Sequence, residues 1–456
     1  MKALVIGGGI SGLVCAYQLH RLGVEVTLLE ESARLGGVIA THKQDGFQFE
    51  LGPQSFLSSP KLLEVISKLG LDGELLRADS KAPRFVLVNG ALHPVPMAPR
   101  TLLGTSLLGV STKLKLLCEP LRNSQPPGSD ESVAAFVRRK FGADLLDNLV
   151  GPFVSGVHAG DPERLSLRSA FPSVHQWEKE YGSVLRGAMK SRPAKDAPRP
   201  ALCSFRDGAE TLVRALAEAL GDATVTGVRV TSVRRSKADG SSCFEVRAQR
   251  RGGEETLHAD ALVLATNTAA AAEILAQVSG KFSSLLRPVE YAPVAVVGAG
   301  YRREQVGHAL NGFGFLVTRK ERLRVLGTVW CSSLFPGRAP DGKVTLTSFV
   351  GGATDTNLVN LSDDQVAEET DREVARVLRI SGPPVTRVFK RWPRALPQYN
   401  LGHSQMLAAL RQETARVPGL FLTGNYLVGP SIAQCAEQAL STAQAVQQYL
   451  SAERTS

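Results

Sequence analysis

The sequence predicts an α/β fold built around a dinucleotide-binding domain with a parallel sheet, and three observations carry this prediction. An apolar stretch at 3–6 leads into a glycine-rich turn that is followed by helical spacing at 13–22. A second apolar stretch, at 24–29, ends at the acidic residue Glu30. A continuous apolar run at 261–265 is typical of a buried parallel strand. The chain is therefore expected to begin with a βαβ unit to which later strands are added.

The turn at 7–12 reads Gly-Gly-Gly-Ile-Ser-Gly. Gly7 permits the tight turn, Gly9 lets the backbone approach a pyrophosphate, and Gly12 lets helix and strand pack closely. The pyrophosphate is expected at the helix N-terminus, where free N–H groups and the helix dipole favour negative charge. Glu30 is expected to accept hydrogen bonds from the adenosine ribose. The alternative is a glycine-rich turn in another kind of α/β protein.

Two further turns bear on the length of the cofactor. Arg34-Leu35-Gly36-Gly37 follows the second strand directly, and Glu50-Leu51-Gly52-Pro53 follows a hairpin-like stretch. A second paired-glycine turn so close to the first suggests that more backbone wraps around a longer molecule. An adenine dinucleotide with an isoalloxazine tail fits this need, although Glu30 alone does not separate a flavin from a nicotinamide. An ordinary turn at Gly36-Gly37 is the alternative.

The composition is that of a soluble globular protein. The 456 residues exceed what one core accommodates, so two or three domains are expected. Hydrophobic residues make up 43% and charged residues 21%. Six cysteines occur without metal-ligand spacing, which predicts reduced thiols and no metal site. The first strand begins at residue 2, which leaves no room for a targeting segment ahead of it, and no apolar run approaches a membrane span.

The charge is positive and unevenly distributed. Lys and Arg number 53 against 43 Asp and Glu, a surplus of ten that favours anionic partners. Residues 81–118 contain no acid but carry lysines and arginines among many leucines and valines. Such a stretch lies on an anionic membrane surface or forms a core segment with solvated lysines. Aromatic residues are few and no nucleic-acid motif is present, so no nucleic-acid partner is expected.

The remaining elements follow in order. Helices are predicted at 132–141, after a polar link, and at 211–220, after a Pro-rich basic loop at 192–200. Strands are predicted at 228–233 and 244–248, besides 261–265. Residues 271–415 indicate a second, α+β domain, with strands at 294–299, 324–330 and 343–350 and a helix at 364–378. A strand at 418–425 ends in a glycine turn, and a final helix starts at Pro430. Its predicted buried stripe is Ile432, Ala436, Ala439, Ala443, Val446 and Leu450.

Together and in order, these pieces resemble the protoporphyrinogen/coproporphyrinogen oxidase family of the flavin amine oxidase superfamily over nearly the whole chain. The first three marks are shared with related flavoproteins, and the later ones are more particular to this family. The marks lie at 7–12, 34–37, 49–53, 84–90, 156–161, 165–166, 171–172, 312–317, 326–328, 335–336, 351–352 and 397–399.

The resemblance implies three domains. A discontinuous, Rossmann-like FAD-binding domain comprises residues 1–80, 204–270 and 416–456. An α+β substrate-binding domain comprises 81–89 and 271–415, and a helical membrane-binding domain comprises 90–203. The implied location is cytoplasmic, with peripheral association with the inner membrane. The sequence leaves a homodimer open.

The resemblance also implies the reaction. With non-covalent FAD and molecular oxygen, protoporphyrinogen IX loses six electrons to give protoporphyrin IX in haem biosynthesis, and hydrogen peroxide is the by-product. A hydride passes from a methylene bridge to the flavin N5, while the protein supplies position and electrostatics. Three alternatives stay open. They are coproporphyrinogen III oxidation, which needs more cations at the pocket rim, an amine oxidase or carotenoid desaturase on the same frame, and a non-catalytic scaffold.

The implied substrate contacts come from several segments. Arg84 pairs with a propionate, for which its planar guanidinium is suited. Leu316, Val329 and Phe349 line the macrocycle, Gly314 keeps the wall flat, and Gly156 lies in a loop close to the flavin. No residue is assigned as a general base. The implied cofactor contacts are Gly7, Gly8, Gly9, Ile10, Ser11, Gly12, Glu30, Glu31, Arg34, Gly36, Gly37, Val38, Gly52, Pro53, Gln54, Ser55, Val230, Gly424, Asn425, Pro430, Ser431 and Ile432.

Overall fold

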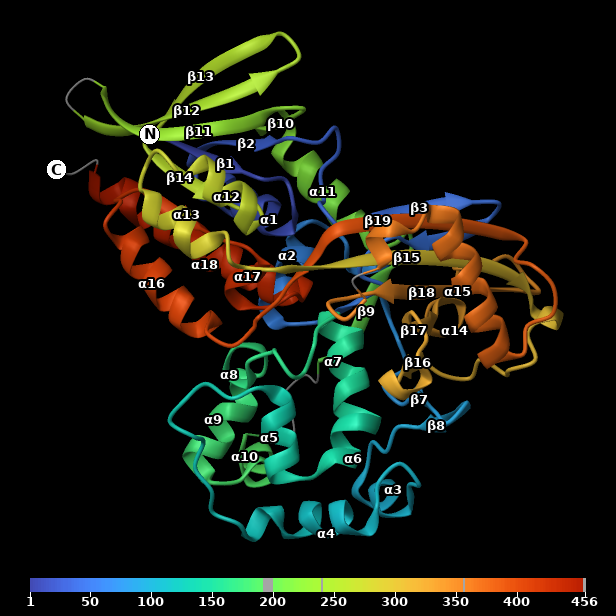
Figure 1. Ribbon diagram of the computed structural model, residues 1–456. Coiled ribbons are helices and arrows are strands. Elements are labelled where there is room, and N and C mark those ends of the chain that lie inside the picture. The colour runs from blue at the N-terminus through green and yellow to red at the C-terminus, as the bar shows by residue number, and fades with distance from the viewer. Residues whose placement is uncertain (192–199, 239–240, 356, 454–456) are drawn as a thin grey trace.

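The computed structural model describes residues 1–191, 200–238, 241–355 and 357–453 (Figure 1). Most of the Pro-rich loop expected at 192–200 lies outside these residues. Within the described part of the chain, no helix combines the length and the apolar character that crossing a bilayer requires.

A five-stranded, all-parallel sheet contains the expected βαβ unit. Its order is β10 (Thr224–Thr226), β2 (Glu25–Glu30), β1 (Lys2–Ile6), β14 (Ala261–Leu264) and β20 (Leu420–Leu422). The strands come from the beginning, the middle and the end of the chain, so this sheet is discontinuous in sequence, as predicted. The apolar run at 261–265 does supply a fully buried strand beside β1.

Helices cover one face of this sheet. They are α1 (Ile10–Arg21), α2 (Pro60–Lys68), α11 (Glu210–Leu220) and α18 (Ile432–Glu453), and together with the sheet they form one apolar core. All six residues of the stripe predicted on the last helix are buried in that core. The helix begins at Ile432 rather than at Pro430 because the Ser431 hydroxyl accepts the Gln434 N–H at 3.2 Å and caps it.

The other face carries a second layer. The antiparallel strands β11 (Arg229–Ala238), β12 (Ser241–Arg250) and β13 (Gly253–Ala259) lie there with α12 (Thr268–Ile274), α13 (Gly280–Leu286) and α16 (His403–Ala415). Two short elements adjoin the sheet: α17 (Asn425–Val428) and the three-stranded set β5 (Phe56–Leu57), β9 (Leu202–Phe205) and β6 (Leu75–Arg77).

A seven-stranded sheet forms the second body in Figure 1. Its order is β19 (Thr386–Pro397), β15 (Tyr291–Arg302), β18 (Lys343–Gly351), β17 (Val325–Trp330), β16 (Gly314–Val317), β7 (Arg84–Val88) and β8 (Ala91–Pro94). All neighbours are antiparallel except β16 and β7. One face packs on α15 (Asp363–Leu378), and α14 (Cys331–Leu334) follows β17. The opposite face meets the hairpin β3 (Thr41–Gln44) and β4 (Phe47–Glu50).

Short helices form the third body, the helical region, residues 99–190. They are α3 (Pro99–Gly104), α4 (Val110–Cys118), α5 (Val133–Lys140), α6 (Ala143–Leu145), α7 (Gly151–His158), α8 (Leu167–Ala170), α9 (Pro172–Tyr181) and α10 (Val184–Lys190). A π-helical turn at Leu146–Val150 joins α6 to α7. Pro152, the second residue of α7, has no N–H, so the α-helical hydrogen-bond pattern is interrupted at this turn.

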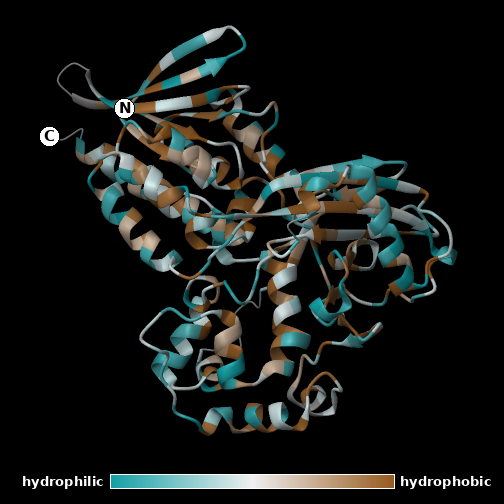
Figure 2. Ribbon diagram, in the orientation of Figure 1, coloured by the Kyte–Doolittle hydropathy of each residue, from teal (hydrophilic) through white to brown (hydrophobic). Residues whose placement is uncertain are grey.

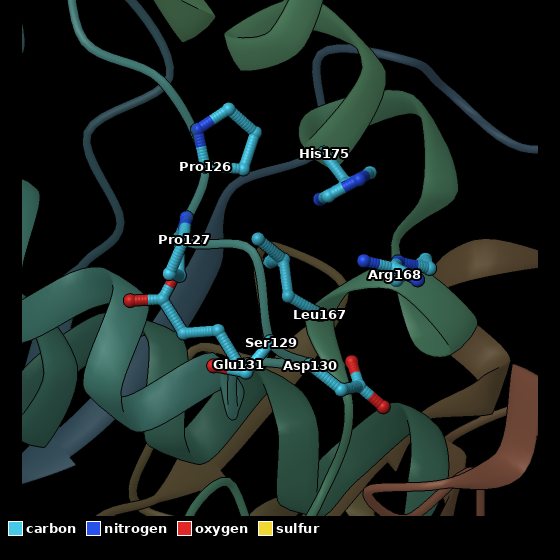
Figure 3. A pocket seen from close by; sticks show the side chains of 8 residues that line it. All are labelled: Pro126, Pro127, Ser129, Asp130, Glu131, Leu167, Arg168 and His175. Carbon is cyan, nitrogen blue, oxygen red and sulfur yellow. The ribbon is translucent and has the colours of Figure 1, made fainter.

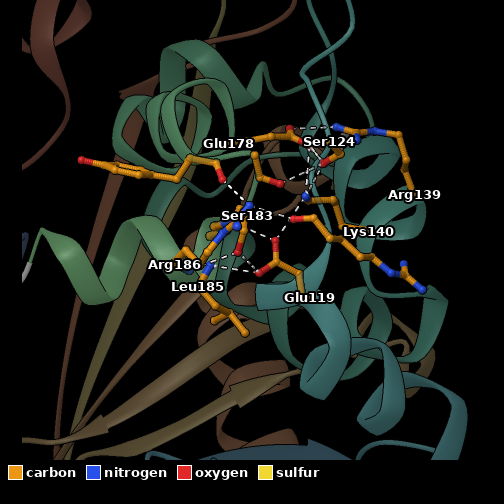
Figure 4. Close-up of polar contacts among 12 residues, drawn as sticks. Glu119, Ser124, Arg139, Lys140, Glu178, Ser183, Leu185 and Arg186 are labelled. Carbon is orange, nitrogen blue, oxygen red and sulfur yellow. Dashed lines mark hydrogen bonds and ion pairs between the residues drawn. The ribbon is translucent and has the colours of Figure 1, made fainter.

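A buried ion cluster holds the helical region together (Figure 4). The Lys140 ammonium lies 3.2 Å from Glu119 and 3.2 Å from Glu178, and the side chains of both acids are fully buried. Glu119 also accepts hydrogen bonds from the Ser183 hydroxyl and from the backbone at the start of α10. Glu178 accepts two from Arg139 and one from Ser124. The cluster ties four segments of the region to one another.

Candidate active site

The glycine turn is closed on its sheet side and open on its outer side. A Cβ on Gly12 would lie 1.8 Å from the Gly7 carbonyl oxygen, so only glycine allows α1 to lie this close to β1. A Cβ on Gly9 would meet no atom within 4 Å. Gly9 precedes α1 without a side-chain cap, and no acid lies in the first helical turn. The α1 N-terminus therefore has the open space and free N–H groups that a pyrophosphate needs.

Glu30 ends β2 beside this turn. One of its carboxylate oxygens accepts the Gly8 N–H at 2.6 Å, and the other accepts the Ser32 N–H at 2.8 Å. The acid thus lies where a ribose would adjoin the pyrophosphate. The neighbouring Glu31 is exposed and pairs with Arg229 at 3.5 Å, whereas Val230 is buried in β11.

The second glycine turn packs on the first. The Gly36 N–H donates to the Gly8 carbonyl at 2.7 Å. Arg34 folds back onto its own loop, where its guanidinium donates to the carbonyls of Leu35, Ile39 and Gly37. Arg34 therefore shapes the loop that carries Gly37 and Val38. A Cβ on Gly52 would lie 1.9 Å from the Val38 carbonyl oxygen, so the third turn packs on the second in the same way.

The Gln54 side chain is turned into the protein. Its amide nitrogen donates to the carbonyls of Glu50 at 2.9 Å and Gly52 at 3.2 Å, and its amide oxygen accepts the Cys331 thiol at 3.1 Å. In this geometry the side chain fixes the turn at 52–55, and the backbone of that turn and Ser55 are left to face a ligand. The predicted contact at Gln54 therefore shifts from the side chain to the turn that the side chain holds.

The C-terminal segment follows β20, an edge strand of the parallel sheet, and leaves it at the same carboxyl edge as the glycine turn after β1. Gly424 caps α17, and the Asn425 carbonyl accepts the Tyr399 hydroxyl at 2.7 Å. Ser431 and Ile432 start α18, which packs along α1. The apolar segment after Asn425 forms the short helix α17, whose Tyr426 is fully buried.

Two orphaned hydroxyls mark the carboxyl edge of the parallel sheet. Thr266 follows β14 and Thr423 follows β20. Both hydroxyls are buried, and neither has a hydrogen-bond partner among the described residues. An unpartnered buried hydroxyl costs about 1–3 kcal/mol, and ligands of open α/β sheets bind outside the carboxyl ends of the strands. The open turn at Gly9, the acid at Glu30 and these hydroxyls together fit a dinucleotide.

A second buried ion pair lies beneath the turn at 52–55. Glu50 accepts hydrogen bonds from the Thr41 hydroxyl at 2.8 Å and from the Ala209 N–H at 3.0 Å, while Arg338 is 3.9 Å away. Burial raises the pKa of Glu50 to about 7, because two hydrogen bonds and a distant guanidinium do not offset it. Arg338 also donates to Ser204, Phe205 and Arg206, so it joins β9 to the large sheet.

One face of the large sheet carries the predicted substrate residues. Arg84, Gly314 and Val329 are paired in one row. Leu316, Gly327 and Phe349 form the next row. Paired residues point to the same face of a sheet. The structure thus brings together five of the six predicted substrate residues, and the Leu316, Val329 and Phe349 side chains are half-buried.

The sixth residue, Gly156, also reaches this face, but from a helix. It lies in α7 rather than in the expected loop, and a Cβ on it would lie 2.3 Å from a methyl of Leu316. Gly156 therefore lets α7 approach the sheet. The role expected of Gly314 also changes: its φ is +143°, and a Cβ there would lie 2.1 Å from the Thr328 carbonyl, so the backbone itself requires glycine.

Arg84 stands at the edge of this face, where its guanidinium makes a cation–π contact and no ion pair among the described residues. It is exposed, and its guanidinium lies 5.4 Å from the centre of the Phe313 ring. Two aromatic neighbours escaped the sequence analysis. Phe313 precedes Gly314, and Phe153, which is 46% exposed, lies one turn before Gly156 on the same side of α7. The sequence did hold a signal for Phe153, because an aromatic residue three positions before a glycine lies on the same side of a helix as that glycine.

Burial affects three histidines in this part of the structure. His158 ends α7 with its ring edge-on to Phe171 and Tyr399, at 5.3 and 5.8 Å between ring centres. Burial lowers the pKa of His158 to about 4, so it is neutral at physiological pH. Burial also lowers the pKa of His308 and of His403, whose ring nitrogen is 2.9 Å from the Tyr426 carbonyl.

Comparison with known proteins identifies the family. The flavin containing amine oxidoreductase family matches residues 10–447. The chain belongs to this family. It is therefore an oxidoreductase with a flavin cofactor, and FAD fits the turns described above.

The most similar relatives span nearly the whole chain. Chloroplastic protoporphyrinogen oxidase of Oryza sativa subsp. japonica is 35% identical over 98% of this chain and 88% of that protein. Coproporphyrinogen III oxidase of Bacillus subtilis (strain 168) is 31% identical over 95% of each. A crystal structure of a protein from Exiguobacterium sp. 255-15, named after protoporphyrinogen oxidase, superposes with a TM-score of 0.82 at 25% identity over 98% of each chain. These relatives confirm the resemblance on which the sequence analysis rested.

Proposed function

We propose that this protein oxidises protoporphyrinogen IX to protoporphyrin IX in haem biosynthesis. The substrate loses six electrons and six protons, and each oxygen molecule takes two of each to become hydrogen peroxide. The observation that carries the proposal is an arginine, Arg84, that has no ion-pair partner among the described residues and stands at the edge of a half-buried apolar face. A reduced tetrapyrrole is an apolar macrocycle with carboxylate arms, so it needs such a face and such a cation.

FAD, when bound, supplies the hydride acceptor for this reaction. The chain's own residues bind and orient both molecules. Gly9 and the α1 N-terminus would hold the pyrophosphate, and Glu30 the ribose. Leu316, Val329 and Phe349 would hold the macrocycle flat while Arg84 holds one propionate. Non-covalent attachment is supported by Cys435, whose thiol is buried within α18 at 3.6 Å from the Gly429 carbonyl.

The same proposal includes the predicted domain division and the remaining predicted site residues. The residues 1–80, 204–270 and 416–456 would bind FAD, and 81–89 with 271–415 would bind the porphyrinogen. Residues 90–203 would associate with the inner membrane on its cytoplasmic side.

An exposed stripe on α4 and the 3₁₀ turn that follows it, Glu119–Leu121, supports a membrane contact. Val110, Leu114, Leu117 and Leu121 recur at helical spacing and are 74%, 56%, 54% and 85% exposed. Lys113 and Lys115 lie between them. Figure 1 places α4 at the end of the helical region farthest from the parallel sheet, and Figure 2 shows its mixed apolar and polar positions. An apolar stripe with flanking lysines suits an anionic bilayer surface. Sedimentation with phosphatidylglycerol vesicles should be lost in Leu114→Glu but kept in Leu57→Glu.

The reaction is tested by an anaerobic half-reaction. Oxidised protein mixed with protoporphyrinogen IX should lose its flavin absorbance while a Soret band appears. In turnover with oxygen, Arg84→Ala should raise KM about tenfold or more, because a hydrogen bond to a charged group is lost, with FAD content unchanged. Arg251→Ala removes an exposed arginine elsewhere and should leave KM as it is. Flavin that stays oxidised in the half-reaction would refute the proposal.

Coproporphyrinogen III is the second candidate substrate. Relatives that bear the name of its oxidase match over 95% of this chain. The same apolar face would serve a macrocycle with four carboxylate arms, which would need further cations at the rim besides Arg84. Parallel measurement of kcat/KM for the two porphyrinogens decides between them. A higher value for coproporphyrinogen III would replace protoporphyrinogen IX as the substrate.

A further inference from the structure

A groove on the helical region is separate from the site described above. Its volume is about 490 Å³, within the range of small-molecule sites. Figure 3 shows the smaller recess that adjoins this groove and shares Pro126, Pro127, Arg168 and His175 with it. Pro126 and Pro127 form one side, and Arg168 and His175 face them from the other. Lys179 lies one helical turn beyond His175 on α9. Neither the cofactor contacts nor the substrate residues include any of these side chains.

The acids that adjoin the groove are already compensated. One Asp130 oxygen accepts the Ser166 hydroxyl at 2.7 Å, and the other accepts the Gly402 N–H at 3.0 Å. Glu131 makes a two-pronged ion pair with Arg139 at 2.9 and 2.8 Å. Glu131 thus has a counter-ion of its own, and both Asp130 oxygens are directed at neutral donors rather than at Arg168.

The bases are not compensated. Arg168 is half-buried, and its Nε is fully enclosed without a hydrogen-bond partner among the described residues. Neither Arg168 nor Lys179 forms an ion pair in that part of the chain. A guanidinium partly removed from water without an acid partner is costly, so its retention indicates a missing anionic partner.

We propose that this groove is a binding site for a small oxyanion, a carboxylate or phosphate group, held by Arg168 with Lys179 and His175. Arg168 offers the planar set of donors that such groups accept in pairs. The prolines opposite would contact the apolar body of an organic anion. The ligand is a free small molecule rather than a lipid headgroup, because the exposed apolar stripe lies on a different element, α4.

The site carries its own pH signature. Burial lowers the pKa of His175, as do the charges of Arg168 and Lys179, while Glu178 and Asp130 act in the opposite direction. A bound anion adds negative charge beside the ring and so favours the imidazolium. By reciprocity, the anion must bind more tightly when His175 is protonated. Sulfate keeps its charge between pH 5.5 and 8, so its affinity change reports the protein alone.

The test is a titration of the FAD-loaded protein with ¹³C-labelled histidine rings, using sodium sulfate and sodium succinate at constant ionic strength. The His175 resonance is assigned with His175→Gln. Either anion should shift it saturably, and sulfate should bind about fivefold or more tightly at pH 5.5 than at pH 8. Arg168→Gln should weaken binding about tenfold or more. Arg411→Gln, which removes an exposed charge elsewhere, should bind like the wild type.

Lys179→Gln is the second variant, since it leaves the partly buried Arg168 in place, and it should weaken binding severalfold. A shift produced only by phosphatidylglycerol vesicles would overturn the free-anion assignment in favour of a headgroup. The absence of any shift, or one that persists unchanged in Arg168→Gln and Lys179→Gln, would overturn the site itself.

Discussion

The molecule has two buried sites in which the pKa values of the carboxyl groups shift in opposite directions. In the helical region, Glu119 and Glu178 surround Lys140, and between them they accept hydrogen bonds from hydroxyls, backbone N–H groups and Arg139 (Figure 4). Beneath the proposed flavin turn, Glu50 has two hydrogen bonds, and Arg338 stays 3.9 Å away. All three acids are almost entirely removed from water.

The pKa values separate the two sites. Burial acts to raise the pKa of Glu178, but hydrogen bonds from Arg139 and Ser124 and the charge of Lys140 outweigh it and lower the pKa to about 2. Burial also opposes ionisation of Glu119, where hydrogen bonds from Ser183 and the α10 backbone again lower the pKa. At Glu50, burial prevails and the pKa is about 7. The number and closeness of donors, rather than depth, decide whether a buried acid is charged.

The largest expected effect removes the shared cation. Lys140→Met keeps the side-chain volume but leaves Glu119 and Glu178 without their common counter-charge. We expect the free energy of unfolding at pH 7.5 to fall by about 3–5 kcal/mol, as when one partner of a buried pair is removed. Urea denaturation followed by circular dichroism measures it. Lys61→Met, at an exposed lysine, should stay within about 0.5 kcal/mol. Equal losses of stability in the two variants would mean that the buried ion cluster does not stabilise the protein.

Glu178→Gln probes the acid side of the same cluster. The folded-state pKa is depressed from 4.5 to about 2, so the stabilisation by Glu178 is complete above pH 4.5 and is lost as the pH falls through 2. We expect the variant to be about 3 kcal/mol less stable than the wild type at pH 7, with the gap closing toward pH 2. A gap that is independent of pH would contradict a charged Glu178.

Glu50→Gln should behave in the opposite sense. Because the folded-state pKa is raised from 4.5 to about 7, the wild type loses stability as the pH rises through this window, and the loss persists above it. The variant carries no charge to bury. The two proteins should therefore be equally stable near pH 4.5, and the variant about 3 kcal/mol more stable at pH 8. Urea denaturation at pH 4.5, 6 and 8 measures this, and a variant less stable at pH 8 would reverse our reading of Glu50.

The smallest effect tests one donor. Thr41→Val removes the hydroxyl that donates to Glu50 at 2.8 Å. We expect a loss of about 1 kcal/mol at pH 8, where Glu50 is charged, and a smaller loss at pH 5. Thr231→Val removes an exposed hydroxyl that donates to a backbone carbonyl, and it should show no such dependence on pH. If Thr41→Val lowers the free energy of unfolding equally at both pH values, the loss comes from packing and not from the hydrogen bond to Glu50.

Much of the fold could be predicted because its signals are local. The turn at 7–12 does lead into a helix, Glu30 does end a strand, and the apolar run at 261–265 does form a buried strand. The stripe on α18 is buried in full because helical spacing alone determines which residues share a face. The proposed cofactor contacts at Gly9 and Glu30 rest on spacing within one βαβ unit, and the structure places the two residues at the same turn.

The proposed substrate face was less accessible to sequence reasoning. Arg84 and Gly314 are neighbours only because β7 pairs with β16, and Gly156 meets Leu316 only because α7 crosses that sheet. The inward turn of Gln54 likewise depends on Cys331, which arrives from a distant strand. Contacts between residues so far apart in the sequence leave no local pattern. The family resemblance therefore supplied these residues, but it did not explain how they come together.

The sequence by itself determined the nucleotide-binding unit, the helix that ends the chain, and the family to which the chain belongs. Each of these is encoded in spacings short enough to be governed by backbone geometry and side-chain periodicity. Tertiary structure alone decided which buried acids are ionised, that Arg84 and Arg168 have no ion-pair partner among the described residues, and that Gly156 lets α7 approach the large sheet. Those outcomes depend on solvent exclusion and on donors brought together from remote segments, and free energies of that kind exist only once the chain has folded.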